Sequence, residues 1–348
     1  MQPFLQKLTA GKDLSLEEAQ AAMDEIFSGQ ATPAQVGAFL AALRTKGETV
    51  DEIAGCARSM RAHATRVATR HPLVVDTCGT GGDGVGTFNI STTAAFVVAA
   101  GGLPVAKHGN RAASSRSGSA DVLEALGVPI DLAPDQVGAC LDEVGIGFLF
   151  AVRLHGAMRH AGGVRRELGV RTVFNLLGPL TNPAGAQCQL IGVAEPHLVP
   201  MIASVLAALG TRRALVVHGQ GLDEMTVTGS TLVAEADGRG VRSYEVAPED
   251  VGLARASREQ LLGGTPAENA EITLSVLGGA AGPRRDIVCL NAAAALLAGD
   301  VVEDLREGVA RAQAAIDSGG AMRKLDELRA YAQAYAKMDT AAAAGDAQ

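Results

Sequence analysis

The sequence predicts an α/β fold in which a small N-terminal helical bundle precedes a larger domain with a mainly parallel sheet covered by helices. Two patterns predict this fold. Residues 1–70 contain helix signals only, whereas from Leu73 onward short apolar runs alternate with longer helical runs, which is typical of a parallel sheet. The 348 residues suffice for two domains, and a hydrophobic fraction of 47% allows a sizeable core. We therefore expect a helical domain over residues 1–70 and an α/β domain over residues 71–348.

Three capping boxes begin the helices predicted within residues 1–70. In each box a Ser or Thr is followed three positions later by Glu or Gln, and the two residues bond free N–H groups of the first helical turn. The boxes are Ser15 with Glu18, Thr32 with Gln35, and Thr49 with Glu52. The apolar faces of these helices exceed what a bundle of three covers. We expect a later helix or a second subunit to pack against them.

The larger domain is predicted from its alternating runs. Parallel strands are expected at residues 73–75, 105–106, 147–150, 189–193 and 214–217. Helices are expected between them, at residues 92–100, 120–126, 134–143 and 198–209. Short antiparallel strands are expected at residues 225–227, 232–234 and 242–246. Helices should then continue to about residue 335, beginning with a capping box at Thr265 and Glu268.

The charge of the chain limits its partners. The net charge is −8, which argues against a nucleic acid or a membrane surface as partner, because both attract a cationic face. Basic residues nevertheless gather locally, at Lys107, Arg111, Arg116, Arg153, Arg159, Arg165, Arg166 and Arg171. An acidic protein with such a local group of cations suits a phosphorylated small-molecule substrate.

The cysteines and the N-terminus indicate a cytoplasmic protein. The five cysteines are odd in number and form no C-x-x-C pair, so we expect reduced thiols. Polar and charged residues from Gln6 onward are unlike a signal peptide. The most apolar run, residues 94–106, is interrupted by two glycines and Pro104 and is too short to cross a bilayer.

A glycine-rich segment, residues 79–84, joins a predicted strand to a predicted helix that we expect Ser91 to cap. Free backbone N–H groups at such a turn bind phosphate. The segment matches neither a P-loop nor a G-x-G-x-x-G fingerprint, and its glycines alone fit a flexible turn equally well. A second polar segment, residues 107–119, follows the next strand. Both segments should therefore lie at one edge of the sheet, where open α/β folds bind ligands.

Three long motifs carry a resemblance to a known family. GTGGDGVGTFNIST, KHGNRAASSRSGSADVLEALG and RRELGVRTVFNLLGPLTNP resemble the anthranilate phosphoribosyltransferases, and the similarity extends over roughly residues 5–335. The resemblance implies transfer of a phosphoribosyl group from 5-phosphoribosyl 1-pyrophosphate to anthranilate, with Mg²⁺, in tryptophan biosynthesis. It also implies a homodimer with the helical domain as its contact. Catalysis would be electrostatic and positional, so no single catalytic residue is assigned.

The resemblance implies the residues that hold phosphoribosyl pyrophosphate. They are Gly79, Gly82, Asp83, Thr87, Asn89, Ile90, Ser91, Thr92, Lys107, His108, Gly109, Asn110, Arg111, Ala112, Ala113, Ser114, Ser115 and Ser119. For Asp83, a purely structural role in capping its turn is the alternative. For His108, the alternative is a hydrogen-bonded structural imidazole.

The resemblance also implies a metal site and an acceptor site. The metal ligands are Ser91, Asp223 and Glu224, which suits Mg²⁺ because that ion takes few protein carboxylates. The anthranilate residues are Gly79, Asn110, His155, Met158, Arg165, Gly178 and Pro179, and Arg165 would bind the carboxylate. The chain departs from the family at Leu154, Gly156 and Gly163, which replace a His and two prolines. We expect these glycines to loosen the acceptor loop.

Two other functions fit parts of the sequence. A pyrimidine nucleoside phosphorylase would share the fold and the phosphate loops, but residues 107–110 and the Asp223–Glu224 pair resemble the transferase more closely. A non-catalytic nucleic-acid-binding relative would need a basic face and a damaged phosphate loop, whereas this chain is acidic and its loop is intact.

Overall fold

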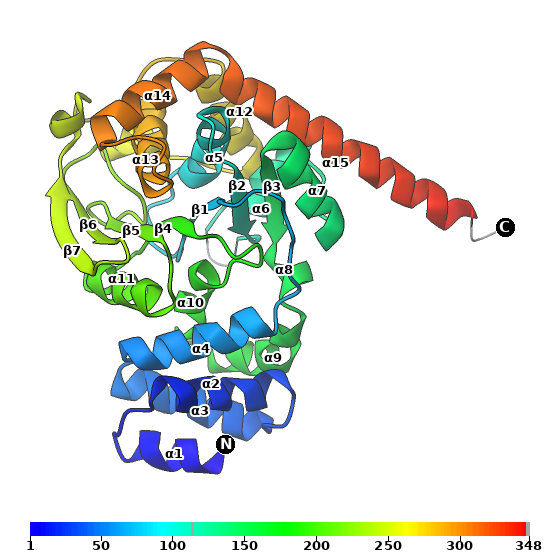
Figure 1. Cartoon of the computed structure of the whole chain (residues 1–348), viewed down its shortest axis with the longest axis vertical. Helices are drawn as coiled ribbons and strands as arrows, with labels where there is room; N and C mark the ends of the chain where they lie inside the picture. The colour runs from blue at the N-terminus through cyan, green and yellow to red at the C-terminus, as the bar shows by residue number, and fades with distance from the viewer. Residues whose placement is uncertain (113–114, 346–348) are drawn as a thin grey trace.

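The structure, a computed structural model, describes residues 1–112 and 115–345, with side chains as far as Ala336. Its N-terminal bundle, at the bottom of Figure 1, comprises α1 (Gln2–Thr9), α2 (Leu16–Phe27), α3 (Pro33–Lys46) and α4 (Val50–Ala62). The three predicted capping boxes form at the starts of α2, α3 and α4. The sequence prediction missed α1, which has no side-chain cap. The ammonium group of Met1 instead pairs with Glu25 of α2.

A helix from later in the chain packs against this bundle, as its uncovered apolar faces predicted. This helix, α9 (Arg159–Leu168), contacts α2 and α3, and Figure 1 shows it next to the bundle. Its Ala161 is fully buried in an apolar cluster that also contains Phe39 of α3 and Ile202 of α11 (Leu198–Ala208). One continuous core therefore joins the bundle to the α/β domain.

Seven strands form one sheet in the order β3-β2-β1-β4-β5-β6-β7. The first five pair in parallel, and β5, β6 and β7 pair antiparallel. The strands are β1 (Val75–Gly79), β2 (Val105–Gly109), β3 (Ile146–Phe150), β4 (Cys188–Gly192), β5 (Arg213–His218), β6 (Thr231–Ala236) and β7 (Val241–Val246). The prediction of a mainly parallel sheet is confirmed.

One predicted strand, residues 225–227, is wrong. The Asn291 side chain takes the place of a neighbouring strand there: its Oδ1 accepts from the Met225 N–H at 3.0 Å, and its Nδ2 donates to the Met225 carbonyl at 2.9 Å. The Thr226 N–H donates to the Thr231 hydroxyl at 3.0 Å. These side chains satisfy the backbone without a sheet ladder, so the segment turns instead of extending.

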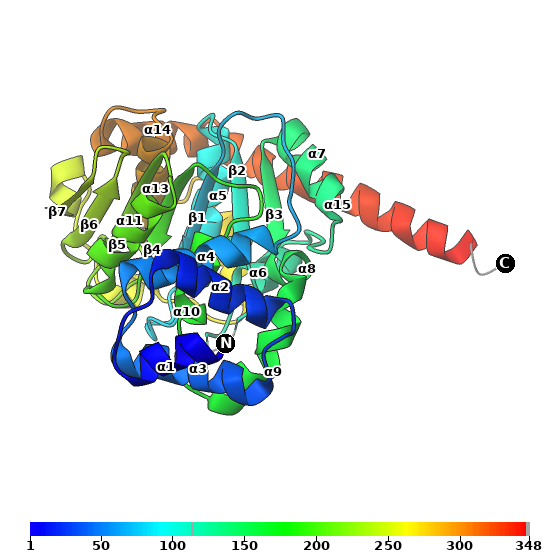
Figure 2. The ribbon, with the colours of Figure 1, turned by 60° about the horizontal axis from the view of Figure 1, so that its bottom comes forward.

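Helices cover both faces of the sheet (Figure 2). On one face lie α5 (Ile90–Ala100) and α13 (Pro283–Ala298), with α14 (Leu305–Asp317) and α15 (Gly320–Gly345) packed on them. On the other lie α7 (Pro134–Val144) and α11 (Leu198–Ala208). The remaining helices are α6 (Ser119–Ala125), α8 (Ala151–Leu154), α10 (Phe174–Leu177) and α12 (Pro266–Leu277), the last beginning at the predicted capping box. Four 3₁₀ turns occupy Gly156–Met158, Gly178–Leu180, Pro248–Val251 and Arg258–Leu261.

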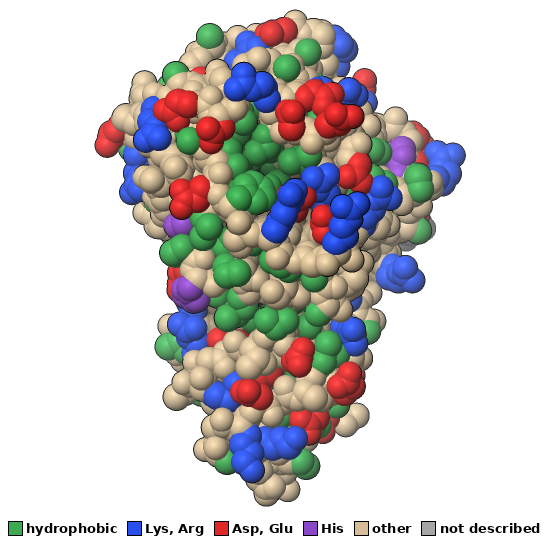
Figure 3. Space-filling model, turned by 60° about the vertical axis from the view of Figure 1, so that its left-hand side comes forward, with side chains coloured by type: hydrophobic (Ala, Val, Ile, Leu, Met, Phe, Trp, Pro, Cys, Tyr) green, Lys and Arg blue, Asp and Glu red, His purple; other side chains and the backbone are tan. Residues whose placement is uncertain are grey.

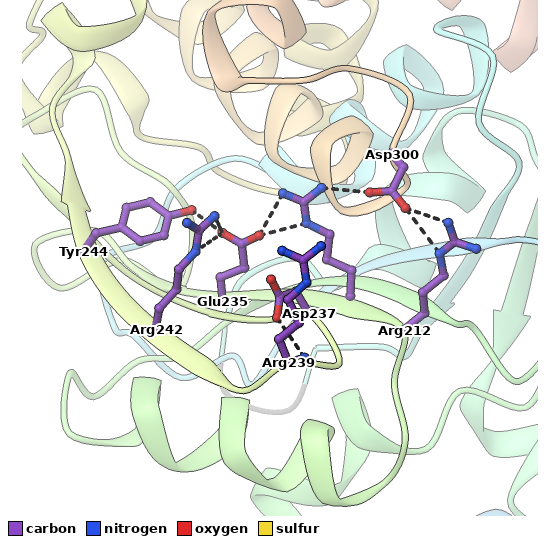
Figure 4. A network of polar contacts seen from close by, with 8 residues as sticks. Arg212, Glu235, Asp237, Arg239, Arg242, Tyr244 and Asp300 are labelled. Atoms are coloured by element: carbon purple, nitrogen blue, oxygen red, sulfur yellow. Dashed lines mark hydrogen bonds and ion pairs between the residues drawn. The ribbon is translucent and has the colours of Figure 1, made fainter.

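The antiparallel edge of the sheet is fixed by one buried carboxylate. Glu235 of β6 is 1% exposed and lies between two arginines and a tyrosine (Figure 4). It accepts from Arg213 at 2.8 Å, from Arg242 at 2.9 Å and from the Tyr244 hydroxyl at 3.0 Å. Arg213 continues to Asp300 at 2.8 Å. The network therefore ties β5, β6 and β7 to the end of α13.

Replacing Glu235 by Ala is expected to lower the free energy of unfolding by about 1–3 kcal/mol, because the donors of Arg213 and Tyr244 that point at it lose their acceptor. Chemical denaturation of the variant and the wild type measures the difference. Glu245→Ala, which removes an exposed carboxylate from the neighbouring strand, is the control and should change stability by less than about 0.5 kcal/mol. Equal stability of the two variants would contradict a structural role for the network.

A hollow lies on the β7 side of the molecule, where Figure 3 shows apolar side chains bordered by acidic and basic ones. This groove has a volume of about 620 Å³, and its apolar lining includes Val246, Val251, Leu297 and Leu305. It shares no lining residue with the cavity at the carboxyl ends of the strands described below. Within the described residues, none of the helices has both the length and the apolar character needed to cross a membrane.

Candidate active site

Three central strands end in glycine at the same edge of the sheet: β1 at Gly79, β2 at Gly109 and β4 at Gly192. The loop after β5 lies directly against two of these glycines. A Cβ atom on Gly192 would stand 1.5 Å from the Asp223 carbonyl oxygen, and one on Gly79 would stand 2.5 Å from Asp223 Oδ2. Any larger residue would displace this loop. The glycines thus bring Asp223 to the carboxyl ends of the parallel strands, the usual ligand site of such sheets.

The predicted acidic residues meet at this edge. Asp223 Oδ2 accepts from the Gly81 N–H at 2.7 Å. Burial, and then the charge of Asp83, raise the pKa of Asp223 to about 6. Burial, and then the charge of Asp223, raise the pKa of Glu224 to about 8. Since desolvation and mutual repulsion both oppose ionisation here, a bound cation would stabilise this group of carboxylates.

The donor set suits Mg²⁺ better than a metal held by protein alone. Among the side chains of residues 1–112 and 115–336, no three of His, Cys, Asp or Glu converge closely enough to hold a metal ion. Mg²⁺ needs only one or two carboxylates, because it retains water and takes oxygens from substrate phosphates. Asp223 and Glu224 provide such a pair.

Ser91 does not cap α5, contrary to our prediction. The helix begins at Ile90 with Asn89 before it, so Ser91 lies in the first turn. Its N–H donates to Glu224 Oε1 at 3.0 Å, because a carboxylate is stabilised at the positive end of a helix. The Ser91 hydroxyl accepts from Lys107 Nζ at 3.4 Å. The three residues therefore form one polar group at the helix N-terminus.

Sequence reasoning missed Asp76, which holds this region together. Asp76 is fully buried in β1, and its carboxylate accepts from the His108 N–H at 3.1 Å and from Asn182 Nδ2 at 2.8 Å. Lys107 is buried too, and its Nζ donates to the Thr77 carbonyl. Burial raises the pKa of Asp76 and lowers that of Lys107, and each charge offsets part of the shift of the other. An acidic residue directly after an apolar run was the available sequence signal.

The glycine-rich loop and the segment after β2 are linked to each other and to α12. Asn89 Nδ2 donates to the Ser117 carbonyl at 3.2 Å, and Asn89 Oδ1 accepts from Asn269 Nδ2 at 2.9 Å. Asp83 closes its own turn by accepting from the Val85 N–H at 3.1 Å, which is the structural alternative foreseen for it. The same two loops contain Gly82, Thr87, Ala112 and Ser115, and Gly109 is the last residue of β2. The side chains of Ile90 and Thr92, in the first turn of α5, are buried.

Arg111 is already paired with protein carboxylates. Its Nη1 lies 2.5 Å from Glu124 and 3.2 Å from Asp121, both on α6. Beside it, the Ser119 hydroxyl donates to the Asn110 carbonyl at 3.2 Å. The other two predicted residues of this segment, Ala113 and Ser114, lie outside the described residues.

Two histidines form a neutral pair beneath the site. His108 Nδ1 lies 3.1 Å from the Gly178 carbonyl, and its Nε2 lies 3.1 Å from His155 Nε2. Because a carbonyl only accepts, His108 carries its proton on Nδ1, and His155 must donate from Nε2. Burial lowers the pKa of His108 to about 3 and that of His155 to about 4. His108 is therefore a hydrogen-bonded imidazole within the protein, which was the alternative to a role in substrate binding.

The histidine pair makes stability depend on pH. Because both folded pKa values lie below the unfolded value of about 6.5, the unfolded chain takes up protons first as the pH falls. Below about pH 6.5 the free energy of unfolding should therefore fall by up to about 1.4 kcal/mol per pH unit for each histidine. Denaturation at several pH values between 7 and 5 measures this slope. His108→Gln with His155→Gln should reduce it, and an unchanged slope would show that the acid sensitivity lies elsewhere.

All seven residues predicted for the acceptor line one cavity of about 590 Å³. These residues are Gly79, Asn110, His155, Met158, Arg165, Gly178 and Pro179. The lining residues that the sequence prediction missed include Met60 of α4, and Phe174 and Asn175 of α10. The cavity therefore lies between the helical bundle and the sheet, and extends from the end of β1 to α9.

Arg165 projects from α9 as an unpaired cation of this cavity. Its guanidinium lies over the Phe174 ring, with Cζ 4.9 Å from the ring centroid. Within the described residues, the guanidinium has no carboxylate at ion-pair distance. Burial lowers the pKa of Arg165, but a guanidinium remains charged at neutral pH. A planar cation stacked on an aromatic ring is well placed to bind a carboxylate with two hydrogen bonds.

The departures from the family pattern lie around the same cavity. Gly156 belongs to the 3₁₀ turn Gly156–Met158, and a Cβ there would meet no atom within 4 Å. Gly163 lies inside α9, so this position is helical, and the expected loosening of a loop does not apply to it. Leu154, at the end of α8, is buried in a small apolar cluster.

Comparison with known proteins agrees with this architecture. The helical bundle domain of the glycosyl transferase family matches residues 2–64, and the a/b domain of the same family matches residues 71–322. Fold and site thus define the class as glycosyl transferases built from these two parts.

Similar proteins narrow the class. The anthranilate phosphoribosyltransferase of Symbiobacterium thermophilum is 60% identical over 95% of this chain and 97% of its own length. The enzyme of Moorella thermoacetica is 58% identical over 95% of this chain and 98% of its own length. The crystal structure of the Thermus thermophilus enzyme has a TM-score of 0.91 and 47% identity, covering 95% of this chain and 99% of that chain. The Saccharomyces cerevisiae enzyme in complex with phosphoribosyl pyrophosphate and Mg has a TM-score of 0.86 and 30% identity, covering 96% and 98%.

The chain belongs to the anthranilate phosphoribosyltransferase family. These relatives favour the transferase over the phosphorylase and nucleic-acid-binding alternatives.

Proposed function

We propose that this protein transfers the 5-phosphoribosyl group of phosphoribosyl pyrophosphate to the amino nitrogen of anthranilate, a step of tryptophan biosynthesis. One observation carries the proposal: a single cavity joins the glycine-rich end of β1 to the unpaired Arg165. In the reaction the C1′–O bond to diphosphate breaks, a bond from the anthranilate nitrogen to C1′ forms, and the amine loses a proton to solvent. The site needs to hold two substrates in line and to stabilise charge, so it needs no strong base.

The loops after β1 and β2 bind phosphoribosyl pyrophosphate in this proposal. Gly79 and Gly82 expose backbone N–H groups to the diphosphate, as glycine-rich loops do for phosphates. Lys107 supplies a cation fixed by Asp76 and by the Thr77 carbonyl. Asn110 and Ser119, linked by a hydrogen bond, lie where the ribose would be held.

Mg²⁺ belongs to the same site in this proposal, held by Asp223, Glu224 and the Ser91 hydroxyl. The raised pKa values of the two carboxyls support this assignment. When bound, Mg²⁺ neutralises charge on the diphosphate that leaves. The protein keeps the ligands in place through the Gly81 and Ser91 N–H groups, which donate to the two carboxylates.

Anthranilate occupies the cavity beside Arg165 in this proposal. The guanidinium would bind its carboxylate, and the apolar ring would lie among Met158, Phe174 and Pro179. Its amino group would then point toward Gly79 and Asn110, where the ribose is expected. The His108–His155 pair fixes the Gly178 carbonyl and with it one wall of the cavity.

Fluorescence tests the function directly. Anthranilate fluorescence should fall when the protein, phosphoribosyl pyrophosphate and Mg²⁺ are all present, and should stay constant when any one of them is omitted. Substrates at about 10 mM exceed the usual KM range of roughly 1 μM to 1 mM. A constant signal with every component present would contradict the proposed reaction.

We further propose that residues 1–70 are a helical domain that forms the contact of a homodimer. Phe4 and Leu5 of α1 support this, because they remain partly exposed at the end of the molecule. Sedimentation equilibrium should give twice the chain mass for the wild type and a monomer for Phe4→Glu, whereas a monomeric wild type would exclude the dimer.

A cytoplasmic location is inferred from the five cysteines, all of which are free thiols.

A further inference from the structure

The two cations predicted to hold phosphoribosyl pyrophosphate already have protein partners. Arg111 pairs with Glu124 and Asp121. Lys107 is held by the Thr77 carbonyl and the Ser91 hydroxyl. The diphosphate of the proposed substrate carries several negative charges and leaves as an anion, so the site needs a further cation that is free to bind it.

Arg171 is such a cation, and it lies against the glycine-rich loop. Its Nη1 is only 2.9 Å from the point where a Cβ on Gly82 would stand. Gly82 has a φ of +77°, a conformation that favours glycine, and the absent side chain leaves room for the guanidinium. The backbone of the glycine-rich loop and the Arg171 guanidinium therefore lie side by side at Gly82.

No carboxylate pairs with Arg171 among the side chains of residues 1–112 and 115–336. Glu48 and Glu195 line the small cavity, about 150 Å³, that Arg171 also lines. Glu48 lies instead 3.9 Å from Arg44, and Glu195 lies 3.6 Å from His197. Asp83, next to Gly82 in the chain, accepts from the Val85 N–H. A half-buried arginine without a partner is uncommon, because its desolvation is not compensated.

The backbone that carries Arg171 is fixed on both sides. Before it, α9 ends at Leu168 and is capped by Gly169, which has the left-handed φ of +62°. After it, the Thr172 N–H donates to Asn175 Oδ1 at 3.0 Å, and Thr172 is buried. The side chain is thus presented to the loop from a rigid segment, as expected of a binding residue.

We propose that Arg171 binds the diphosphate of phosphoribosyl pyrophosphate across Gly82 and retains it as it leaves. This inference rests on the proposed function. A guanidinium binds two phosphate oxygens in parallel, and here it would complement the backbone N–H groups of the loop from the other side. Arg171 would therefore distinguish ligands that contain diphosphate from those that contain only the 5-phosphate.

Binding of two separate ligands tests the proposal. Calorimetric titration with magnesium diphosphate should give an affinity about 10–100-fold lower for Arg171→Ala than for the wild type, because a charged hydrogen bond is lost. Titration with ribose 5-phosphate should give the same affinity within about twofold. Arg171→Lys should recover part of the diphosphate affinity, since it restores the charge without the planar fork. Arg166→Ala removes an exposed neighbour on α9 and should change neither affinity.

Two outcomes would overturn the proposal. An unchanged diphosphate affinity in Arg171→Ala would show that the guanidinium does not bind it. An equal loss of affinity for magnesium diphosphate and ribose 5-phosphate would show that Arg171 only supports the loop. A lower melting temperature in both Arg171→Ala and Arg171→Gln would show the same. Failure of the wild type to bind phosphoribosyl pyrophosphate would instead count against the proposed function, so the two failures are distinguishable.

Discussion

Replacing Asp223 by Asn and Glu224 by Gln together should lower kcat/KM about a thousandfold and abolish its dependence on Mg²⁺. The metal contributes several kcal/mol of charge stabilisation, and about 4 kcal/mol corresponds to a factor of a thousand. Both amides keep an oxygen for the Gly81 and Ser91 N–H groups, so the local backbone should persist. Rates measured across a magnesium titration would show the effect.

Stability separates this loss from unfolding. Without metal, the double variant should be as stable as the wild type or more stable, because it removes buried carboxylates that repel each other. The matched control is Asp326→Asn with Glu327→Gln, an adjacent exposed pair on α15, which should keep full activity. A double variant at the site with unchanged magnesium dependence would place the metal elsewhere.

Replacing Arg165 by Ala should raise the KM for anthranilate about 10–100-fold and leave the affinity for phosphoribosyl pyrophosphate nearly unchanged. The guanidinium lines the acceptor cavity and has no carboxylate partner among the described side chains, and a charged hydrogen bond contributes about 1.5–3 kcal/mol. Steady-state kinetics with each substrate varied in turn would measure both effects. Lys at this position should restore binding only in part, because it cannot form the paired bonds.

Arg166→Ala is the control for the Arg165 variant, since the exposed neighbour lies on the same helix. It should behave as the wild type. If both substrates lost affinity equally in Arg165→Ala, the division of the site into a phosphate half and an acceptor half would be wrong. Loss of the Phe174 contact is checked separately by the melting temperature.

Local sequence rules determined much of the fold. Each capping box depends on residues three positions apart, so all three predicted helices of the bundle start where the spacing placed them. The five parallel strands follow from short apolar runs between helices. The residues that the family motifs assign to the acceptor line one cavity, because side chains that follow parallel strands meet at one edge of the sheet.

Only the tertiary structure decided which side chains, distant in the sequence, bond the backbone groups that the sequence rules assigned to local partners. Residues 225–227 are not a strand because Asn291, far along the chain, satisfies their backbone. Ser91 is not a cap because Glu224 reaches the helix N-terminus from the loop after β5. Likewise, only the fold brings the Arg171 side chain to Gly82, which is far from it in the sequence. Composition and spacing determine which polar groups a segment offers, but folding determines which of them meet, because each buried group takes the nearest partner in space.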